Sequence, residues 1–165
     1  MANFVPRLTS NGMRGNKYWY SATNPFYPNF GLPNCTCYAW GRFWEISNVV
    51  PHLPTSNGED WWNDVSGYET GDKPVLGAVI CLANGPYSGL GHVAIVEEIH
   101  ADGSITTSNS AYNGEYFYLK HGNKNNNWGY PEYDFQGFIY NPEQPIPPTP
   151  SKKSKMPLWF YLKQF

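Results

Sequence analysis

The chain has 165 residues, enough for one ordinary domain with a sizeable core and a short tail. Charged residues make up 15% of the sequence and aromatic residues 18%, which excludes a solvated, disordered chain. Residues 1–150 hold all 13 acidic side chains and 7 of the 11 basic ones, so this body is negatively charged and a poor match for nucleic-acid phosphates.

The first half of the chain predicts an irregular lead-in followed by helices. Residues 1–34 are rich in Asn, Pro, Gly and aromatic side chains, a composition typical of a segment that wraps a core. Residues 36–50 lack proline and place apolar side chains on one face, which predicts a helix that ends before Pro51. A second, short helix is expected at residues 59–63, where acidic residues stand at its start.

The following residues predict short strands. Runs rich in Val and Ile at residues 74–83 and 92–100 have strand length, and Asp102-Gly103 predicts a hairpin into a third strand at residues 104–108. Two more strands are expected, at residues 116–120 and 135–140. Helices followed by an antiparallel set of strands predict an α+β fold.

The composition changes after residue 140. Residues 141–155 are dominated by Pro, Ser, Thr and Lys, which predicts a semi-rigid linker. Residues 156–165 form a short apolar, aromatic tail that docks on the body, starts a further module or touches an interface. No membrane span is expected and no secretory signal is visible, so export would need another route.

Cys35 lies where the lead-in meets the expected helix, and the amides and dipole of a helix N-terminus stabilise a thiolate. A lone cysteine is more often a packing residue, so a reactive one needs a base. His92 follows Gly89-Leu90-Gly91 and opens a strand, which would hold its ring rigidly. The other three histidines, for which a solvated or capping role is expected, are His52, His100 and His121.

A Cys-His site also needs a group that accepts a hydrogen bond from the second ring nitrogen of the histidine. Asn109 stands at the end of the strand after the Asp102-Gly103 turn, and a hairpin would place it beside the His92 strand. The alternative interpretation is that Asn109 only makes a turn with its serine neighbours.

These residues lie in segments that resemble the CHAP family, the cysteine, histidine-dependent amidohydrolases/peptidases of wall hydrolases and phage lysins. Asn34-Cys35-Thr36-Cys37-Tyr38-Ala39-Trp40-Gly41-Arg42 resembles the nucleophile segment of the family, usually Gln-Cys-Thr-Trp-Tyr. Pro74-Val75-Leu76-Gly77-Ala78-Val79 is similar to its first core strand, and Gly91-His92-Val93-Ala94-Ile95-Val96-Glu97 to its histidine strand. The resemblance covers about residues 20–140, in the right order.

The resemblance implies a papain-like CHAP fold, with short N-terminal helices on an antiparallel sheet, and a catalytic domain over residues 1–140. It implies that Cys35 is the nucleophile, His92 the base and later the acid, and Asn109 the residue that orients His92. Asn34 stands where the family often has Gln, and its part in an oxyanion hole stays open.

The resemblance leaves no expected role for a cofactor. Some members of the family bind calcium through an acidic loop before the nucleophile, but residues 18–34 contain no Asp or Glu, so no metal is expected. Cys37 and Cys81 stand where aromatic residues are usual and are expected in the core, and a bridge between them stays open. Core positions are also expected for three tryptophans, Trp40, Trp61 and Trp62.

The function implied is that of a bacteriolytic peptidoglycan hydrolase of the phage endolysin or tail-associated type. It would cleave an amide bond of a Gram-positive wall, as an N-acetylmuramoyl-L-alanine amidase or as an endopeptidase. We expect it to be made in the host cytoplasm, or carried on a virion, and to act on the wall. Two alternatives are a non-catalytic wall- or carbohydrate-binding module and a structural phage tail component attached through the C-terminal tail.

Overall fold

The computed structural model describes residues 3–86 and 89–143. Its helical elements are α1 (Cys35–Ser47), the short 3-10 helix η1 (Gly58–Asp60), α2 (Trp61–Asp64) and the 3-10 segment η2 (Lys124–Gly129). Its strands are β1 (Thr70–Gly71), β2 (Val79–Ala83), β3 (His92–Ile99), β4 (Ile105–Asn109), β5 (Tyr118–Gly122) and β6 (Asp134–Ile139).

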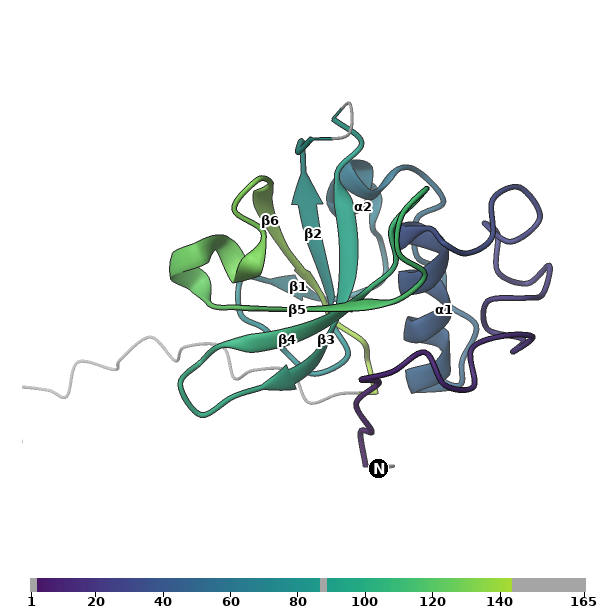
Figure 1. Ribbon diagram of the computed structural model, residues 1–165, viewed down its shortest axis with the longest axis horizontal. Coiled ribbons are helices and arrows are strands. Elements are labelled where there is room, and N and C mark those ends of the chain that lie inside the picture. Colours follow the sequence, from purple (N-terminus) through teal and green to yellow (C-terminus); the bar gives the residue numbers. More distant parts are fainter. Residues whose placement is uncertain (1–2, 87–88, 144–165) are drawn as a thin grey trace, which may run out of the picture.

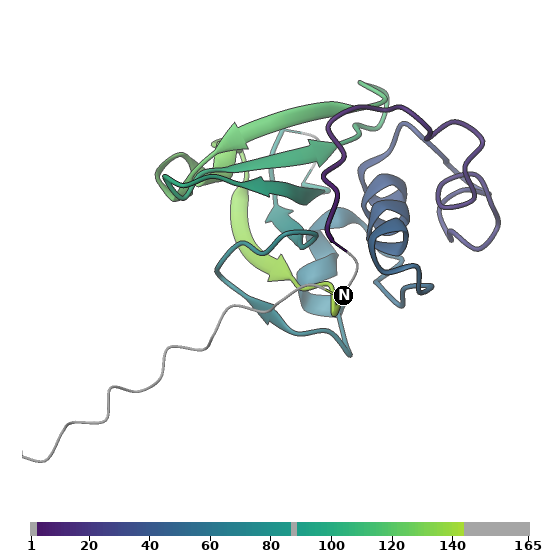
Figure 2. The same ribbon diagram turned by 90° about the horizontal axis from the view of Figure 1, so that it is seen from below.

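The six strands form one antiparallel sheet in the order β1-β6-β2-β3-β4-β5, and α1 packs beside it (Figure 1). The start of the N-terminal lead-in runs between α1 and the sheet, and its later part loops on the far side of α1 (Figure 2). This arrangement confirms the expected papain-like α+β fold, in which helices from the first half of the chain pack on an antiparallel sheet.

The core consists of two clusters, one on each face of the sheet, because side chains along the central strands point alternately to the two faces. On β2, Val79 and Cys81 belong to the cluster shared with α1, whereas Ile80 and Leu82 belong to a second cluster on the other face of the sheet. Successive side chains of a strand point to opposite faces, so one run of apolar residues serves both clusters. The second cluster also contains Trp128 and Tyr130, which the segment after β5 contributes.

The boundaries differ from the sequence-based expectations where single residues change the backbone. Helix α1 ends at Ser47 rather than near Pro51, because Asn48 adopts a left-handed conformation (φ 55°) and donates its amide to the Trp44 carbonyl. Strand β2 begins only at Val79, since a turn precedes it with Gly77 at φ 77°. Sequence patterns also missed β1 and η2, which are very short or irregular.

The domain limits predicted after residue 140 are only partly covered by the structure. Asn141 is buried and donates its side-chain amide to the Phe43 carbonyl at 3.1 Å, which ties the end of the described chain to α1. The predicted tail over residues 156–165, and all but the first three residues of the predicted linker, lie outside the described residues. None of the helices described has the length and apolar character that crossing a bilayer requires.

A buried ionic network fastens α1 to the sheet. The Arg42 guanidinium donates to both oxygens of Glu97, through Nε and Nη2, at 2.9 Å each. Glu97 has a fully buried side chain and also accepts from the Ser108 hydroxyl at 2.7 Å and the Arg7 amide at 2.8 Å. The Tyr38 hydroxyl in turn donates to Ser108 at 2.7 Å. Helix α1, strands β3 and β4 and the N-terminal segment therefore meet at one carboxylate.

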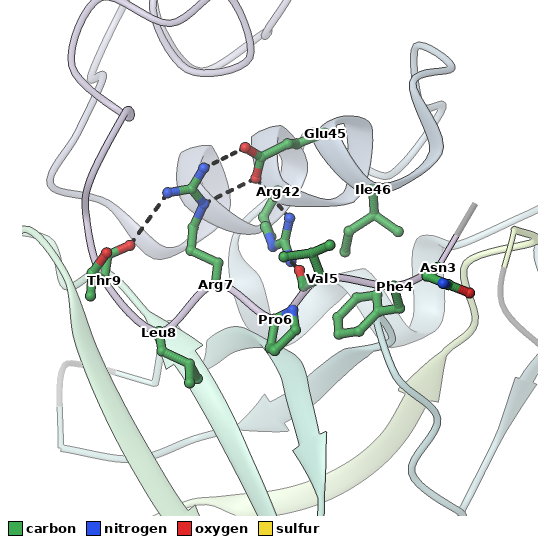
Figure 3. Close-up of a pocket in the computed structure, with 10 residues that line it drawn as sticks. All are labelled: Asn3, Phe4, Val5, Pro6, Arg7, Leu8, Thr9, Arg42, Glu45 and Ile46. Atoms are coloured by element: carbon green, nitrogen blue, oxygen red, sulfur yellow. Dashed lines mark hydrogen bonds and ion pairs between the residues drawn. The ribbon is translucent and has the colours of Figure 1, made fainter.

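Glu45 extends this network to the molecular surface, where residues 3–9 run along α1 (Figure 3). It pairs with Arg42 at 2.8 Å and with Arg7. The N-terminal segment and α1 line a cavity of about 470 Å³, whose charged lining groups, Arg7, Arg42 and Glu45, are bonded to one another or to backbone carbonyls. These bonds attach the N-terminal segment to α1.

We expect Arg42→Met to lower the free energy of unfolding by about 3–5 kcal/mol, because it would leave the Glu97 carboxylate buried without its cation. Urea unfolding followed by tryptophan fluorescence measures this change. The matched control is Glu132→Gln, which breaks the exposed Lys120–Glu132 pair and should cost less than about 1 kcal/mol. Equal losses for the two variants would contradict the role given to Glu97.

Candidate active site

Cys35 is the first residue of α1, and Asn34 caps the helix before it. The Asn34 Oδ1 accepts hydrogen bonds from the amides of Thr36 and Cys37, at 2.9 and 3.1 Å, and from the Thr36 hydroxyl at 2.6 Å. Asparagine at this position satisfies amides that the helix leaves unpaired. The Asn34 amide donates to the Ser110 hydroxyl at 3.1 Å, so the start of α1 is also fixed to the end of β4.

His92 is the first residue of β3, and Asn109 is the last residue of β4. The hairpin brings them together: His92 Nε2 lies 2.9 Å from Asn109 Oδ1, and both side chains are buried. The glycine before His92 makes this packing possible, because a Cβ at Gly91 would overlap the Leu82 carbonyl oxygen and the Glu59 backbone. Because Nε2 is hydrogen-bonded to Asn109, the other ring nitrogen, Nδ1, is the one left to exchange a proton with a neighbouring group.

Cys35 and His92 line the same open cavity of about 620 Å³, and the Val93 amide, next to His92, donates to the Cys35 thiol. Polar and aromatic side chains both line the cavity. Its aromatic lining comes from four segments of the chain: Phe26, Phe30, Tyr112, Tyr118, Tyr130 and Tyr133. The three residues predicted as catalytic thus lie at one place, on α1, β3 and β4; their roles in catalysis stay a prediction.

Burial shifts both titrating groups toward their neutral forms. It raises the pKa of the Cys35 thiol, against the opposite effect of the amides of Val93, Thr36 and Cys35 itself. Burial also lowers the pKa of His92 to about 4, although the bond from Asn109 favours the charged ring. The resting site therefore holds a thiol beside a neutral imidazole. This environment opposes the thiolate that the helix N-terminus favours, because desolvation outweighs the amides.

The remaining sequence candidates lie outside the cavity. Cys37 and Cys81 are free thiols with fully buried side chains. Trp40 and Trp61 are in the core and Trp62 packs against it, as expected. Of the other histidines, His52 stacks on Tyr68 with ring centroids 4.2 Å apart, His100 Nε2 lies 2.8 Å from the Thr106 hydroxyl, and the His121 ring lies 5.0 Å from that of His100.

Two tyrosines at the site escaped the sequence analysis. The Tyr130 hydroxyl donates to Asn109 Oδ1 at 2.7 Å, and the rings of both Tyr130 and Tyr133 lie 5.8 Å from that of His92. They follow the irregular segment η2, in which Asn127 and Trp128 have positive φ. No periodicity marks such a segment, so the sequence carried no signal for them.

Known proteins match much of this chain. The CHAP domain model matches residues 25–111. The chain belongs to the CHAP family. Over 102 residues it is 32% identical to Probable autolysin LDP of Staphylococcus aureus, a match that covers 61% of this chain and 31% of that protein.

Two amidases also resemble this CHAP domain. It is 31% identical over 92 residues to N-acetylmuramoyl-L-alanine amidase sle1 of Staphylococcus epidermidis, covering 50% of this chain and 27% of that protein. A crystal structure of N-acetylmuramoyl-L-alanine amidase from Staphylococcus aureus matches 66% of this chain and 30% of that chain, with a TM-score of 0.50 and 23% identity. This likeness shows the fold. The matches span about a third or less of each relative.

The lowered pKa of His92 makes stability depend on pH. An unfolded chain protonates this histidine near pH 6.5, whereas the folded domain does so only near pH 4. Between these values the unfolded state binds the extra proton, so folding stability falls as the pH falls, by about 3 kcal/mol over the window. Urea unfolding at pH 7 and pH 4.5 tests this. His92→Gln should show a smaller loss than wild type; an equal loss would contradict the burial of a neutral His92.

Proposed function

We propose that this chain is a peptidoglycan hydrolase that cleaves an amide bond with Cys35 as nucleophile. The observation that carries the proposal is the His92–Asn109 hydrogen bond at 2.9 Å in the cavity that Cys35 lines, within a CHAP domain. The names of the relatives, autolysin and N-acetylmuramoyl-L-alanine amidase, supply the substrate class.

The mechanism follows from the neutral resting pair. As the Cys35 sulfur attacks the amide carbonyl, His92 takes the thiol proton at Nδ1, since Nε2 is bonded to Asn109. The same proton then goes to the leaving amine, and an acyl-enzyme remains. His92 next removes a proton from water, which attacks the thioester and releases the acid, and the proton on His92 returns to the Cys35 sulfur. Asn109 keeps the imidazole in the tautomer with hydrogen on Nε2.

The negative charge that develops on the carbonyl oxygen needs hydrogen-bond donors. We assign the Cys35 amide, at the first position of α1, to this role, because it lies beside the sulfur that attacks and at the positive end of the helix. The side-chain oxygen Oδ1 of Asn34 already caps the helix, so Asn34 acts mainly by fixing the backbone that carries the Cys35 amide.

The proposal extends to substrate and setting. We infer an N-acetylmuramoyl-L-alanine amidase, with endopeptidase cleavage as the other outcome of the test, because two relatives carry the amidase name. The staphylococcal relatives support a Gram-positive wall as the substrate. A phage lysin, made in the host cytoplasm or carried on a virion, is the setting we propose.

We expect Cys35→Ala to abolish fragment release from purified Gram-positive peptidoglycan, because no thiol remains to form the acyl-enzyme. Mass spectrometry of the fragments reads the result and also identifies the bond: new L-alanine amino termini indicate the amidase, and new termini elsewhere in the stem or cross-bridge indicate an endopeptidase. The matched control, Cys81→Ala, removes a buried thiol outside the cavity and should keep the activity.

Two results would overturn this assignment. Fragment release that persists in Cys35→Ala would remove the cysteine mechanism. Binding of wild-type protein to the wall without new termini, across several wall chemistries, would favour the non-catalytic binding module.

Two exposed aromatic side chains stand at the rim of the Cys35 cavity. Phe30 is 64% exposed and Tyr112 61%, and their rings meet edge to face with centroids 6.3 Å apart. Exposed aromatic pairs beside a polar site typically contact a ligand rather than the core. We assign them to substrate binding, where they would hold the wall fragment across the cavity.

We expect Tyr112→Ala to raise the KM for a soluble muropeptide by roughly 5-fold, with kcat nearly unchanged, because the lost contact serves binding before and during reaction alike. Steady-state kinetics with the purified fragment measures both constants. Leu119→Ala, which truncates an exposed residue outside the cavity, is the control and should change neither. A fall in kcat alone would contradict a binding role for Tyr112.

A further inference from the structure

Tyr130 contacts both partners of the His92–Asn109 pair. Its hydroxyl donates to Asn109 Oδ1 at 2.7 Å, and its ring lies 5.8 Å from the His92 ring, tilted by 44°. The side chain is buried, and its hydroxyl lies 2.6 Å from the Thr107 hydroxyl. The phenol is thus held between Thr107, in the middle of β4, and Asn109, the group that orients the base.

The Asn109 carboxamide is fixed in one direction. Its Nδ2 donates to the Thr107 carbonyl at 3.1 Å and to the Thr107 hydroxyl at 3.3 Å, while its Oδ1 accepts from both His92 and Tyr130. Turning the carboxamide over would place its oxygen against the Thr107 carbonyl and its NH₂ against the Tyr130 hydroxyl. Each hydrogen bond that such a turn breaks in a buried site is costly to lose.

The orientation of this carboxamide decides which ring nitrogen of His92 carries the proton. A neutral imidazole has one N–H group, and an acceptor opposite Nε2 places the hydrogen there. Nδ1 is then free of hydrogen and able to accept one from a thiol. If Oδ1 turned away from His92, the hydrogen would move to Nδ1, and the ring could no longer act as a base toward Cys35.

We propose that Tyr130 is a positioning residue, whose hydroxyl holds Asn109 so that His92 keeps its hydrogen on Nε2. The expected effect of Tyr130 on the reaction rate rests on the proposed function. Its effect on the tautomer of His92 does not. The hydroxyl keeps its proton over the working pH range, because burial raises the pKa of Tyr130. Lys120 Nζ lies 5.1 Å from the centroid of the Tyr130 ring, where the cation further holds the ring in place.

The test removes only the hydroxyl. In Tyr130→Phe we expect kcat on a soluble muropeptide to fall by roughly 10- to 100-fold at unchanged KM. We also expect the nitrogen-15 NMR signals of the His92 ring to move from a single Nε2–H tautomer toward a mixture. The control is Tyr140→Phe, which removes the hydroxyl of another buried tyrosine, one that donates to the Lys73 carbonyl at 2.8 Å, far along the chain from the hairpin. It should lose a similar amount of stability and leave kcat and the tautomer unchanged.

Thr107→Val provides a second variant, in case Tyr130→Phe does not fold. It removes the hydroxyl that supports Tyr130 and Asn109 on their other side, and should shift the tautomer in the same direction. An unchanged Nε2–H tautomer in Tyr130→Phe, or in Thr107→Val where the first variant is unfolded, would overturn the proposal. The NMR measurement separates the two hypotheses: a wild-type protein without hydrolase activity would refute the proposed function, while the tautomer still reports on Tyr130.

Discussion

The Glu97 carboxylate accepts hydrogen bonds from the helix that carries Cys35, from strand β4 and from the N-terminal segment, and it stands itself on the strand that begins with His92. The pairing of β3 with β4 shifts register between Val96 and Glu98, at this residue. A bulge of this kind re-aims a side chain, and here the side chain is the acceptor on which α1 is anchored. The position of the Cys35 thiol relative to His92, its proposed base, therefore depends on one buried carboxylate to which three segments donate hydrogen bonds.

Such a network favours one arrangement over others more than it adds stability. A buried ion pair gains little over an apolar pair of the same shape, because both ions must leave water. The network instead fixes the placement of the helix: Arg42 can donate both hydrogen bonds to Glu97 only when α1 has one rotation about its axis and one position along the sheet. An apolar interface between the same elements would tolerate small slides. A site whose acid and nucleophile reside on different elements requires that such slides be excluded.

Much of this arrangement could be predicted from local sequence. The run without proline at residues 36–50 predicted α1, and Asp102-Gly103 predicted the hairpin that brings Asn109 to His92. These features follow from interactions among neighbours in the chain. Tyr130 could not be found in this way, because it reaches Asn109, 21 residues away in the chain, from beyond an irregular segment that no periodicity marks. The shift of Cys35 and His92 toward their neutral forms could not be predicted from sequence either, since desolvation depends on which groups the completed fold places around these two side chains.

The residues of the candidate site come from α1, from both strands of the β3–β4 hairpin and from the segment after η2. They are therefore synthesised one after another, over most of the length of the chain. Contacts between distant segments form slowly, because each loop between them must close against its own entropy. The segment with Tyr130 and Tyr133 is the last of them to be synthesised. A partly synthesised chain would hold the thiol without its oriented base, and on the proposed mechanism the cell that makes the protein meets an amide-cleaving site only once the domain is whole.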